Sequence, residues 1–304
     1  MNPKSVRTFR QTCAFRLATT LAIAGLLLKT AGASEGEVTT VLSSRSGAYI
    51  EALAGVQETV GTALRVVDLS RGDSIPEHAK VIIAIGGRAA IHDYPRNVAL
   101  VYCVAPTLIL KSDPHNAPRI KVYVSPAPRL LMPRLKSLQP SLVRLGFIYI
   151  NPAYERYIAE MRREEAGTGI QVDPKQVRSI EQMPDQLRAI KGQVDALWLP
   201  PDPALITPQS FELLRLFSLG NSIPLYVPME GLAEKGATAA VGVSFRDMGR
   251  KAGVLAAQLL SGSIVESNIY YGDHVSVVIN AEAAAQLGLK IPAGALNDAD
   301  RVIR

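Results

Sequence analysis

Short runs of β-branched apolar residues alternate with helical stretches in the first part of the chain, and this pattern constrains the fold most strongly. Three such runs are VTTVLSS at 38–44, AKVIIAIGG at 79–87 and VALVYCVAP at 98–106, and a helical stretch places Leu53, Val56 and Val60 on one face. Continuous apolar strands that alternate with helices are typical of a parallel sheet covered on both faces. We therefore predict an α/β fold.

The same pattern begins again in the second half of the chain. LVRLGFIYINP at 142–152 and DALWLPP at 195–201 read as strands, with a further strand around 169–172 and helices near 153–166 and 184–191. Helix starts are indicated by Thr207 before Pro208, by Ser244 with Asp247, and by Asn280. We therefore expect a second α/β lobe to begin near residue 125.

The N-terminus reads as a cleavable signal peptide. Lys4, Arg7, Arg10 and Arg16 precede an apolar run from Leu17 to Leu28, and Ala31-Gly32-Ala33 offers a cleavage site after Ala33. The run is short for a permanent membrane span, so an uncleaved anchor is the less favoured alternative. We expect the mature protein to be exported to the periplasm.

Removal of the leader changes the charge balance and the cysteine count. The chain has 33 basic and 27 acidic residues, and five of the basic residues, with no acidic one, lie in the leader. The mature chain is then nearly neutral, which argues against nucleic-acid binding. Only Cys103 remains after cleavage, so no intramolecular disulfide can form, and a buried thiol is the favoured interpretation.

Four segments carry a resemblance to a known family. They read DALWLPPDPALITP from 195, NSIPLYVPMEG from 221, KGATAAVGVSFRDMGRKAGVLAAQLLSG from 235, and VSVVINAEAAAQLGLKIP from 275. These four segments resemble the ABC-transporter substrate-binding proteins of the tryptophan and tyrosine uptake type. The resemblance implies the two-lobed type I periplasmic-binding fold, in which each lobe is a parallel sheet flanked by helices and the lobes close by a hinge.

The resemblance also implies the limits of the lobes and the partners. Lobe one is expected at 34–124 with 244–266 returning to it, and lobe two at 125–243 with 267–304. The implied function is capture of a small molecule, an amino acid or a related compound, for the permease subunits of an importer. We expect a monomer without a cofactor. A sensory or accessory envelope protein is the alternative.

Candidate ligand contacts in lobe one follow from the rule that ligands of parallel sheets lie beyond the carboxyl ends of the strands. These ends carry Ser43, Ser44, Gly86, Gly87 and Ala89. Glycines allow a close approach of the backbone, and free amide groups favour an anion. We predict that this edge contacts the acidic end of a solute. The alternative is that both glycines only satisfy a tight turn.

Lobe two contributes Asn151, Tyr154, Asp202, Met229 and Glu230 after its strands. Asp202 resembles an aspartate that family members present to the ligand, where it would pair with an amino group. The family commonly has Asp-Asn where this chain has Asp202-Pro203, so a simple turn residue is the open alternative. Tyr154 either stacks on a flat ligand or covers a helix.

A second departure from the family lies near Asp113-Pro114, since the Asn-x-Thr-Gly crossing that usually follows is absent. The ligand-facing loops have therefore diverged. Either the solute differs from the aromatic amino acids, or the protein is a sensing or accessory protein that no longer feeds a transporter.

Enzyme motifs are weak in this chain. The segment RGDSIPEH at 71–78 resembles a hydrolase block but lacks a later Asp-x-x-His, and Gly242-Val-Ser244 lacks the last glycine of a nucleophile elbow. The four histidines show no spacing typical of a metal site. We predict a binding protein and not an enzyme, with a hydrolase as a distant alternative.

Overall fold

A computed structural model describes residues 37–62, 64–111 and 115–304 of the chain. The predicted signal peptide and the Asp113-Pro114 pair lie outside these described residues. Within them, no helix combines the length and the hydropathy needed to cross a membrane.

The first sheet is formed by strands from the N-terminal part of the chain and one later strand. Its described strands are β1 (Val38–Leu42), β2 (Arg65–Asp68), β3 (Val81–Ile85), β4 (Ala99–Cys103), β5 (Arg119–Val122) and β11 (Ile269–Tyr270). Their order is β11-β5-β4-β3-β1-β2, and every pairing is parallel. β1, β3 and β4 are buried along their whole length, as their continuous apolar sequences require.

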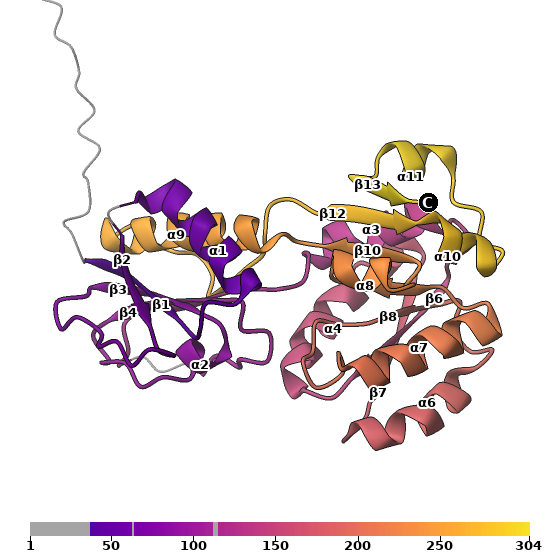
Figure 1. Ribbon diagram of the computed structural model, residues 1–304, viewed down its shortest axis with the longest axis horizontal. Coiled ribbons are helices and arrows are strands. Elements are labelled where there is room, and N and C mark those ends of the chain that lie inside the picture. Colours follow the sequence, from indigo (N-terminus) through magenta and orange to yellow (C-terminus); the bar gives the residue numbers. More distant parts are fainter. Residues whose placement is uncertain (1–36, 63, 112–114) are drawn as a thin grey trace, which may run out of the picture. The chain divides into compact units, whose positions relative to one another are not determined.

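Two long helices, α1 (Gly47–Val60) and α9 (Phe245–Leu260), cover one face of this sheet although they lie far apart in the sequence. Figure 1 shows α9, in orange, beside the indigo α1. The helices approach closely because glycines face the partner backbone: a Cβ at Gly55 would lie 1.9 Å from the Arg246 carbonyl oxygen, and one at Gly249 would lie 1.9 Å from that of Ala52. The short helix α2 (Gly87–Ala90) follows β3.

The second sheet is mixed. Its described strands are β6 (Arg144–Tyr149), β7 (Gln171–Gln176), β8 (Ala196–Trp198), β9 (Leu225–Val227), β10 (Ala239–Gly242), β12 (Ser276–Asn280) and β13 (Arg301–Ile303). They lie in the order β13-β12-β10-β9-β8-β6-β7. The β10–β12 pairing is antiparallel and the other pairings are parallel, so the predicted parallel sheet contains one antiparallel pair. The chain re-enters this sheet after β11 of the first sheet, without a covering crossover helix, so β12 runs opposite to β10.

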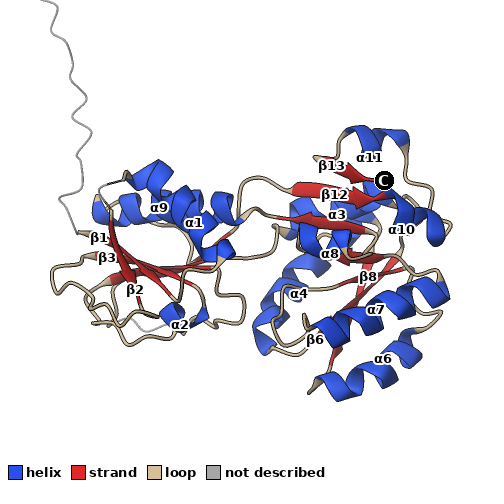
Figure 2. Cartoon of the chain, in the orientation of Figure 1, coloured by secondary structure: helices blue, strands red, loops and turns tan. Residues whose placement is uncertain are grey.

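Helices flank both faces of the second sheet, as Figure 2 shows in blue. They are α3 (Pro128–Leu138), α4 (Glu155–Arg163), α5 (Glu165–Thr168), α6 (Met183–Ile190), α7 (Pro208–Asn221), α8 (Glu230–Glu234), α10 (Ala281–Gln286) and α11 (Ala293–Asn297), with 3-10 turns η1 (Pro152–Tyr154) and η2 (Ile180–Gln182). The predicted N-caps are confirmed: Thr207, Ser244 and Asn280 each accept a backbone N–H three residues further on.

Each sheet has an apolar core on both faces. In the first sheet, one core includes Val56, Ile83 and Leu255, and the other includes Val41 and Leu100. In the second sheet the two cores contain Phe147 with Trp198, and Leu197 with Leu214. Burial on both faces explains why these strands read as continuous apolar runs and not as alternating ones.

The chain passes between the two sheets three times, at 123–127, 243–244 and 271–275, which we call the crossing segments. Two α/β lobes, each built on its own sheet, define the type I periplasmic-binding architecture that the sequence predicted. We call the six-stranded part lobe one and the seven-stranded part lobe two. The domain limits predicted from the sequence stay a prediction.

Candidate functional site

The carboxyl ends of β1, β3 and β4 are tied together at one edge of lobe one. The Ser43 amide donates to the Ile85 carbonyl (3.0 Å), and the Gly86 amide donates to the Cys103 carbonyl (2.9 Å). The Ser43 hydroxyl oxygen also accepts a hydrogen bond from the Ala89 amide (2.9 Å). Parallel strands place their carboxyl ends at the same edge, so the structure brings Ser43, Gly86 and Ala89 together.

Not all the lobe-one candidates are equally open to a ligand. Ser43 and Ala89 are buried, and their hydrogen bond to each other uses the Ala89 amide. Ser44 is half-buried and Gly87 is exposed. Ser44 and Gly87 are therefore the candidates that a solute can reach, while Ser43 and Ala89 shape the loops behind them.

Gly86 has a structural role. The sequence indicated a tight turn at this position, and the structure shows why the turn needs a glycine. Its φ is 92°, a left-handed value that favours glycine, and a Cβ would lie 2.6 Å from both Ser43 Oγ and Tyr49 Cζ. Gly87 differs, because no described atom lies within 4 Å of its Cβ position. The first glycine is required by the turn and the second is not.

Backbone strain marks the end of β4. Val104, directly after this strand, has φ 52°, a value that β-branched residues rarely adopt. Its side chain is buried in the lobe-one core, which holds the strained turn in place. Strain of this kind is often found at ligand-facing loops, and Val104 lies in the apolar run at 98–106 that the sequence indicated as a strand.

Asp202 holds two loops of lobe two together. Its Oδ2 accepts a hydrogen bond from the Asn151 amide (3.2 Å) and its Oδ1 accepts one from the Ala204 amide (3.0 Å). The side chain is fully buried. The Ala204 bond is the geometry of an Asp-initiated turn, as the alternative interpretation of Asp202 expected. Contact between Asp202 and a ligand stays a prediction.

Asn151 and Tyr154 follow β6 and lie near Asp202. Asn151 Oδ1 caps the η1 turn by accepting the Ala153 amide (2.8 Å). The Tyr154 ring is buried in the core with Phe147 and Trp198, and its hydroxyl has no hydrogen-bond partner among the described residues. Burial, followed by the Asp202 carboxylate, raises the pKa of the Tyr154 phenol well above its ordinary value. The phenol is therefore a neutral hydrogen-bonding group.

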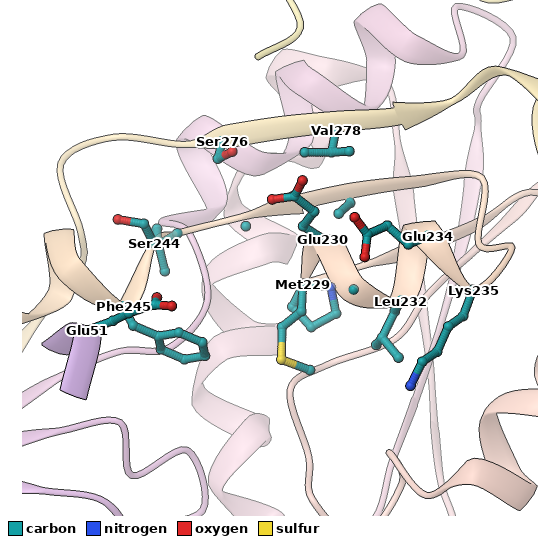
Figure 3. A pocket seen from close by; sticks show the side chains of 15 residues that line it. Glu51, Met229, Glu230, Leu232, Glu234, Lys235, Ser244, Phe245, Ser276 and Val278 are labelled. Atoms are coloured by element: carbon teal, nitrogen blue, oxygen red, sulfur yellow. The ribbon is translucent and has the colours of Figure 1, made fainter. Parts of the chain in front are cut away.

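Met229 and Glu230 lie in a pocket of about 580 Å³ at the start of α8. Its lining includes Leu232, Ser276 and Phe245, and Figure 3 shows the Phe245 ring extending toward Met229. The carboxylate of Glu230 pairs with Arg301 of β13, which also pairs with Glu234. The other predicted site residues do not line this pocket.

Sequence reasoning missed Phe245 and Leu232 as pocket residues. The sequence indicates Ser244 as a helix cap and excludes it from a nucleophile elbow, and Phe245 follows it directly as the first residue of α9. Phe245 lines the pocket because the start of α9 lies near α8. The local sequence around Phe245 gives no information on the position of one helix relative to the other.

The described residues show no arrangement that would activate Ser244 or Cys103 as a nucleophile. Ser244 Oγ donates to Asp247 Oδ2 (2.7 Å) and accepts the Asp247 amide (3.0 Å), so this hydroxyl serves as a cap. Cys103 is buried, and burial raises the pKa of its thiol to about 12. No group of three His, Cys, Asp or Glu side chains in the described part of the chain is arranged to hold a metal ion.

The family is shown by comparison with known proteins. Residues 133–303, more than half of the chain, match the model of the ABC transporter substrate binding protein family. The chain belongs to this family, as its sequence predicted. A curated relative, the tyrosine-binding protein of Clostridioides difficile (strain R20291), is 23% identical over 159 residues; the match spans 51% of this chain and 46% of the relative.

Solved structures agree with the fold. The ABC domain in complex with L-Trp from Streptococcus pneumonia has a TM-score of 0.61 at 17% identity and is covered completely, with 88% of this chain aligned. The ligand-free, open structure of a substrate binding protein with adhesive properties from Clostridium difficile has a TM-score of 0.59 at 17% identity, with 88% of this chain and 98% of that chain aligned. At these identities the likeness supports the fold alone.

Proposed function

We propose that this protein captures a small solute between its two lobes and delivers it to the permease subunits of an ABC importer. The observation that carries the proposal is that the predicted ligand contacts lie after the carboxyl ends of strands in both sheets, in a chain of the substrate-binding family. Half-buried Ser44 and exposed Gly87 on lobe one, and Met229 in the pocket at the start of α8, are the residues that a solute would meet first.

The remaining parts of the function follow from the same proposal. The relatives that carry a ligand in their names take tyrosine or L-Trp, which supports an amino acid or a related compound as the first ligand class to test. The predicted leader and the family favour a location outside the inner membrane, in the periplasm. We propose a monomer that acts by binding and release, without a catalytic step.

The test is a thermal-shift screen of residues 34–304 against amino acids, organic acids, sugars and nucleosides, followed by calorimetry of each hit. A ligand at about 100 times its dissociation constant adds about 2.7 kcal/mol to the free energy of unfolding. A saturable hit with one site supports the proposal. A protein that binds no member of the panel would count against it.

A matched pair of variants tests the placement of the site. Gly87→Val puts an exposed side chain at the predicted edge, in space that the fold leaves open. Gly220→Val makes the same change near the end of α7, also in open space. We expect Gly87→Val to weaken binding of the hit and Gly220→Val to leave it unchanged. Equal affinities in both variants would remove the Gly87 loop from the site.

A further inference from the structure

Three arginines follow three neighbouring strands of lobe one at the edge of the predicted site. Arg45 comes shortly after β1, Arg71 after β2 and Arg88 after β3. The three strands are adjacent and parallel, in the order β3-β1-β2, so their carboxyl ends meet at one edge. The sequence pattern indicated the serines and glycines of these loops and gave no signal for the arginines beside them.

A buried carboxylate holds two of these arginines. Asp68, the last residue of β2, is 1% exposed, and its Oδ2 lies 3.3 Å from Arg45 Nε and 3.6 Å from Arg71 Nε. Its Oδ1 accepts hydrogen bonds from the Ser70 hydroxyl (2.6 Å) and the Ser70 amide (2.9 Å). Hydrogen bonds from Ser70, with help from both guanidinium groups and against the effect of burial, hold the pKa of Asp68 below its ordinary value. The carboxylate therefore stays ionised and orients both arginines.

The arrangement leaves positive charge facing solvent. One carboxylate faces two guanidinium groups, whose side chains are 50% and 64% exposed. Among the described residues, no other ion pair or hydrogen bond uses the side chain of Arg45 or Arg71, and each guanidinium group meets Asp68 through Nε. The terminal Nη groups of both side chains are thus available, and a guanidinium fork suits the two oxygens of a carboxylate.

The predicted ligand contacts of lobe two include no carboxylate that is free to pair with an amino group of the solute. Both Asp202 oxygens accept backbone amides in a fully buried position, and Glu230 pairs with Arg301. An amino group that paired with Asp202 or Glu230 would have to displace one of these interactions. An acidic group on the solute meets two arginines that are already in place.

We propose that Arg45 and Arg71, held by Asp68, bind an acidic group of the solute, so that the ligand class is organic acids with no requirement for an amino group. This inference rests on the proposed solute-binding function and specifies its ligand. It makes Arg45 and Arg71 specificity-determining residues at the edge formed by Ser44 and Gly87.

The test uses probes that differ only in their charged groups. Calorimetry of residues 34–304 would compare indole-3-propionate, L-tryptophan and tryptamine, and the corresponding phenol and isobutyl series of acid, amino acid and amine. We expect at least one acid to bind and its amine counterpart to bind at least about tenfold more weakly, because the amine lacks the group that the arginines recognise. Binding of acids should weaken as salt is raised.

Three single variants locate the effect. Arg45→Gln and Arg71→Gln each leave one cation beside Asp68, which protects the fold, and each is expected to weaken binding of the acid about tenfold. Arg65→Gln is the matched control, since it removes an exposed arginine from the amino end of the same strand β2. Circular dichroism and thermal unfolding would establish whether all three variants are folded.

The outcomes separate the two proposals. If an amine binds as tightly as its acid, or if both arginine variants bind the acid like Arg65→Gln, the inference is overturned and solute binding stands. If none of the acid, amino acid or amine probes binds and the broad screen also gives no hit, both the inference and the proposed function fail. An acid preference that both Arg45→Gln and Arg71→Gln reduce supports the inference.

Discussion

At the scale of single residues, the two glycines after β3 have different roles and can be tested as a pair. Gly86→Ala forces a side chain onto a left-handed backbone and against Ser43 and Tyr49, so we expect it to lower the free energy of unfolding by about 2–4 kcal/mol. Gly87→Ala meets no described atom and should change it by less than about 0.5 kcal/mol. Urea unfolding measures both values. Equal effects of the two substitutions would contradict the distinction.

The burial of Lys121 leads to a second prediction at the scale of single residues. It is 1% exposed on β5, and its Nζ donates to the carbonyls of Pro106 (2.9 Å) and Leu108 (2.7 Å) and lies 4.5 Å from the centroid of the Tyr123 ring. Burial lowers the pKa of this amine from 10.5 to about 7. A neutral amine still has two N–H groups, which match the two carbonyls. The loop after β4 is therefore held by a lysine that titrates near neutral pH.

The sign of the pH dependence follows from proton binding. Between pH 7 and pH 10.5 the unfolded chain keeps a proton on Lys121 that the folded protein has lost, so stability rises with pH in this window. We expect wild type to gain about 2 kcal/mol relative to Lys121→Met between pH 7 and pH 9. Lys191→Met, at an exposed lysine, is the control. Parallel stability curves for wild type and Lys121→Met would exclude the titration.

At the scale of elements, the α1–α9 pair depends on glycines that allow the two backbones to touch. A Cβ at Gly55 would lie 1.9 Å from the Arg246 carbonyl oxygen, so Gly55→Ala must push the helices apart. We expect a loss of about 3 kcal/mol in the free energy of unfolding. Gly47→Ala, at the open start of the same helix, should be within about 0.5 kcal/mol of wild type. Denaturant unfolding of both variants decides whether the glycine contact carries this stability.

The sequence predicted these elements better than it predicted their contacts. Helix caps such as Thr207 and Asn280 act within one turn, and strands buried on both faces have continuous apolar runs, so local patterns contain both. The approach of Gly55 to Arg246 joins residues about 190 positions apart and leaves no local pattern. The same limit applies to the site. The strand ends were placed by a topological rule, but the burial of Asp202 and the hold of Asp68 on Arg45 depend on loops that meet only in the folded chain.

At the scale of the whole molecule, three tyrosines connect the first and third crossing segments to lobe two. Tyr123 of the first crossing donates to the Ala153 carbonyl (3.0 Å), and Tyr157 of α4 donates back to the Pro126 carbonyl (2.7 Å). Tyr271 of the third crossing donates to Glu160 Oε2 on α4. The three rings pack together, with Tyr123 and Tyr157 stacked at 5.7 Å between centroids. Any hinge motion between the lobes must therefore occur next to this cluster.

Tyr271→Phe tests whether the cluster restrains the crossing. The substitution keeps the ring and removes one hydrogen bond to a carboxylate, so we expect local opening to become easier by about 1.4 kcal/mol. Amide hydrogen exchange should then be about tenfold faster at 271–275, with the β1, β3 and β4 amides unchanged. Tyr226→Phe is the matched control, because its hydroxyl donates to Gln139 Oε1 (3.0 Å) inside lobe two. If Tyr226→Phe raises exchange at the crossing as much as Tyr271→Phe does, or if neither variant raises it, the Tyr271–Glu160 contact does not restrain the hinge.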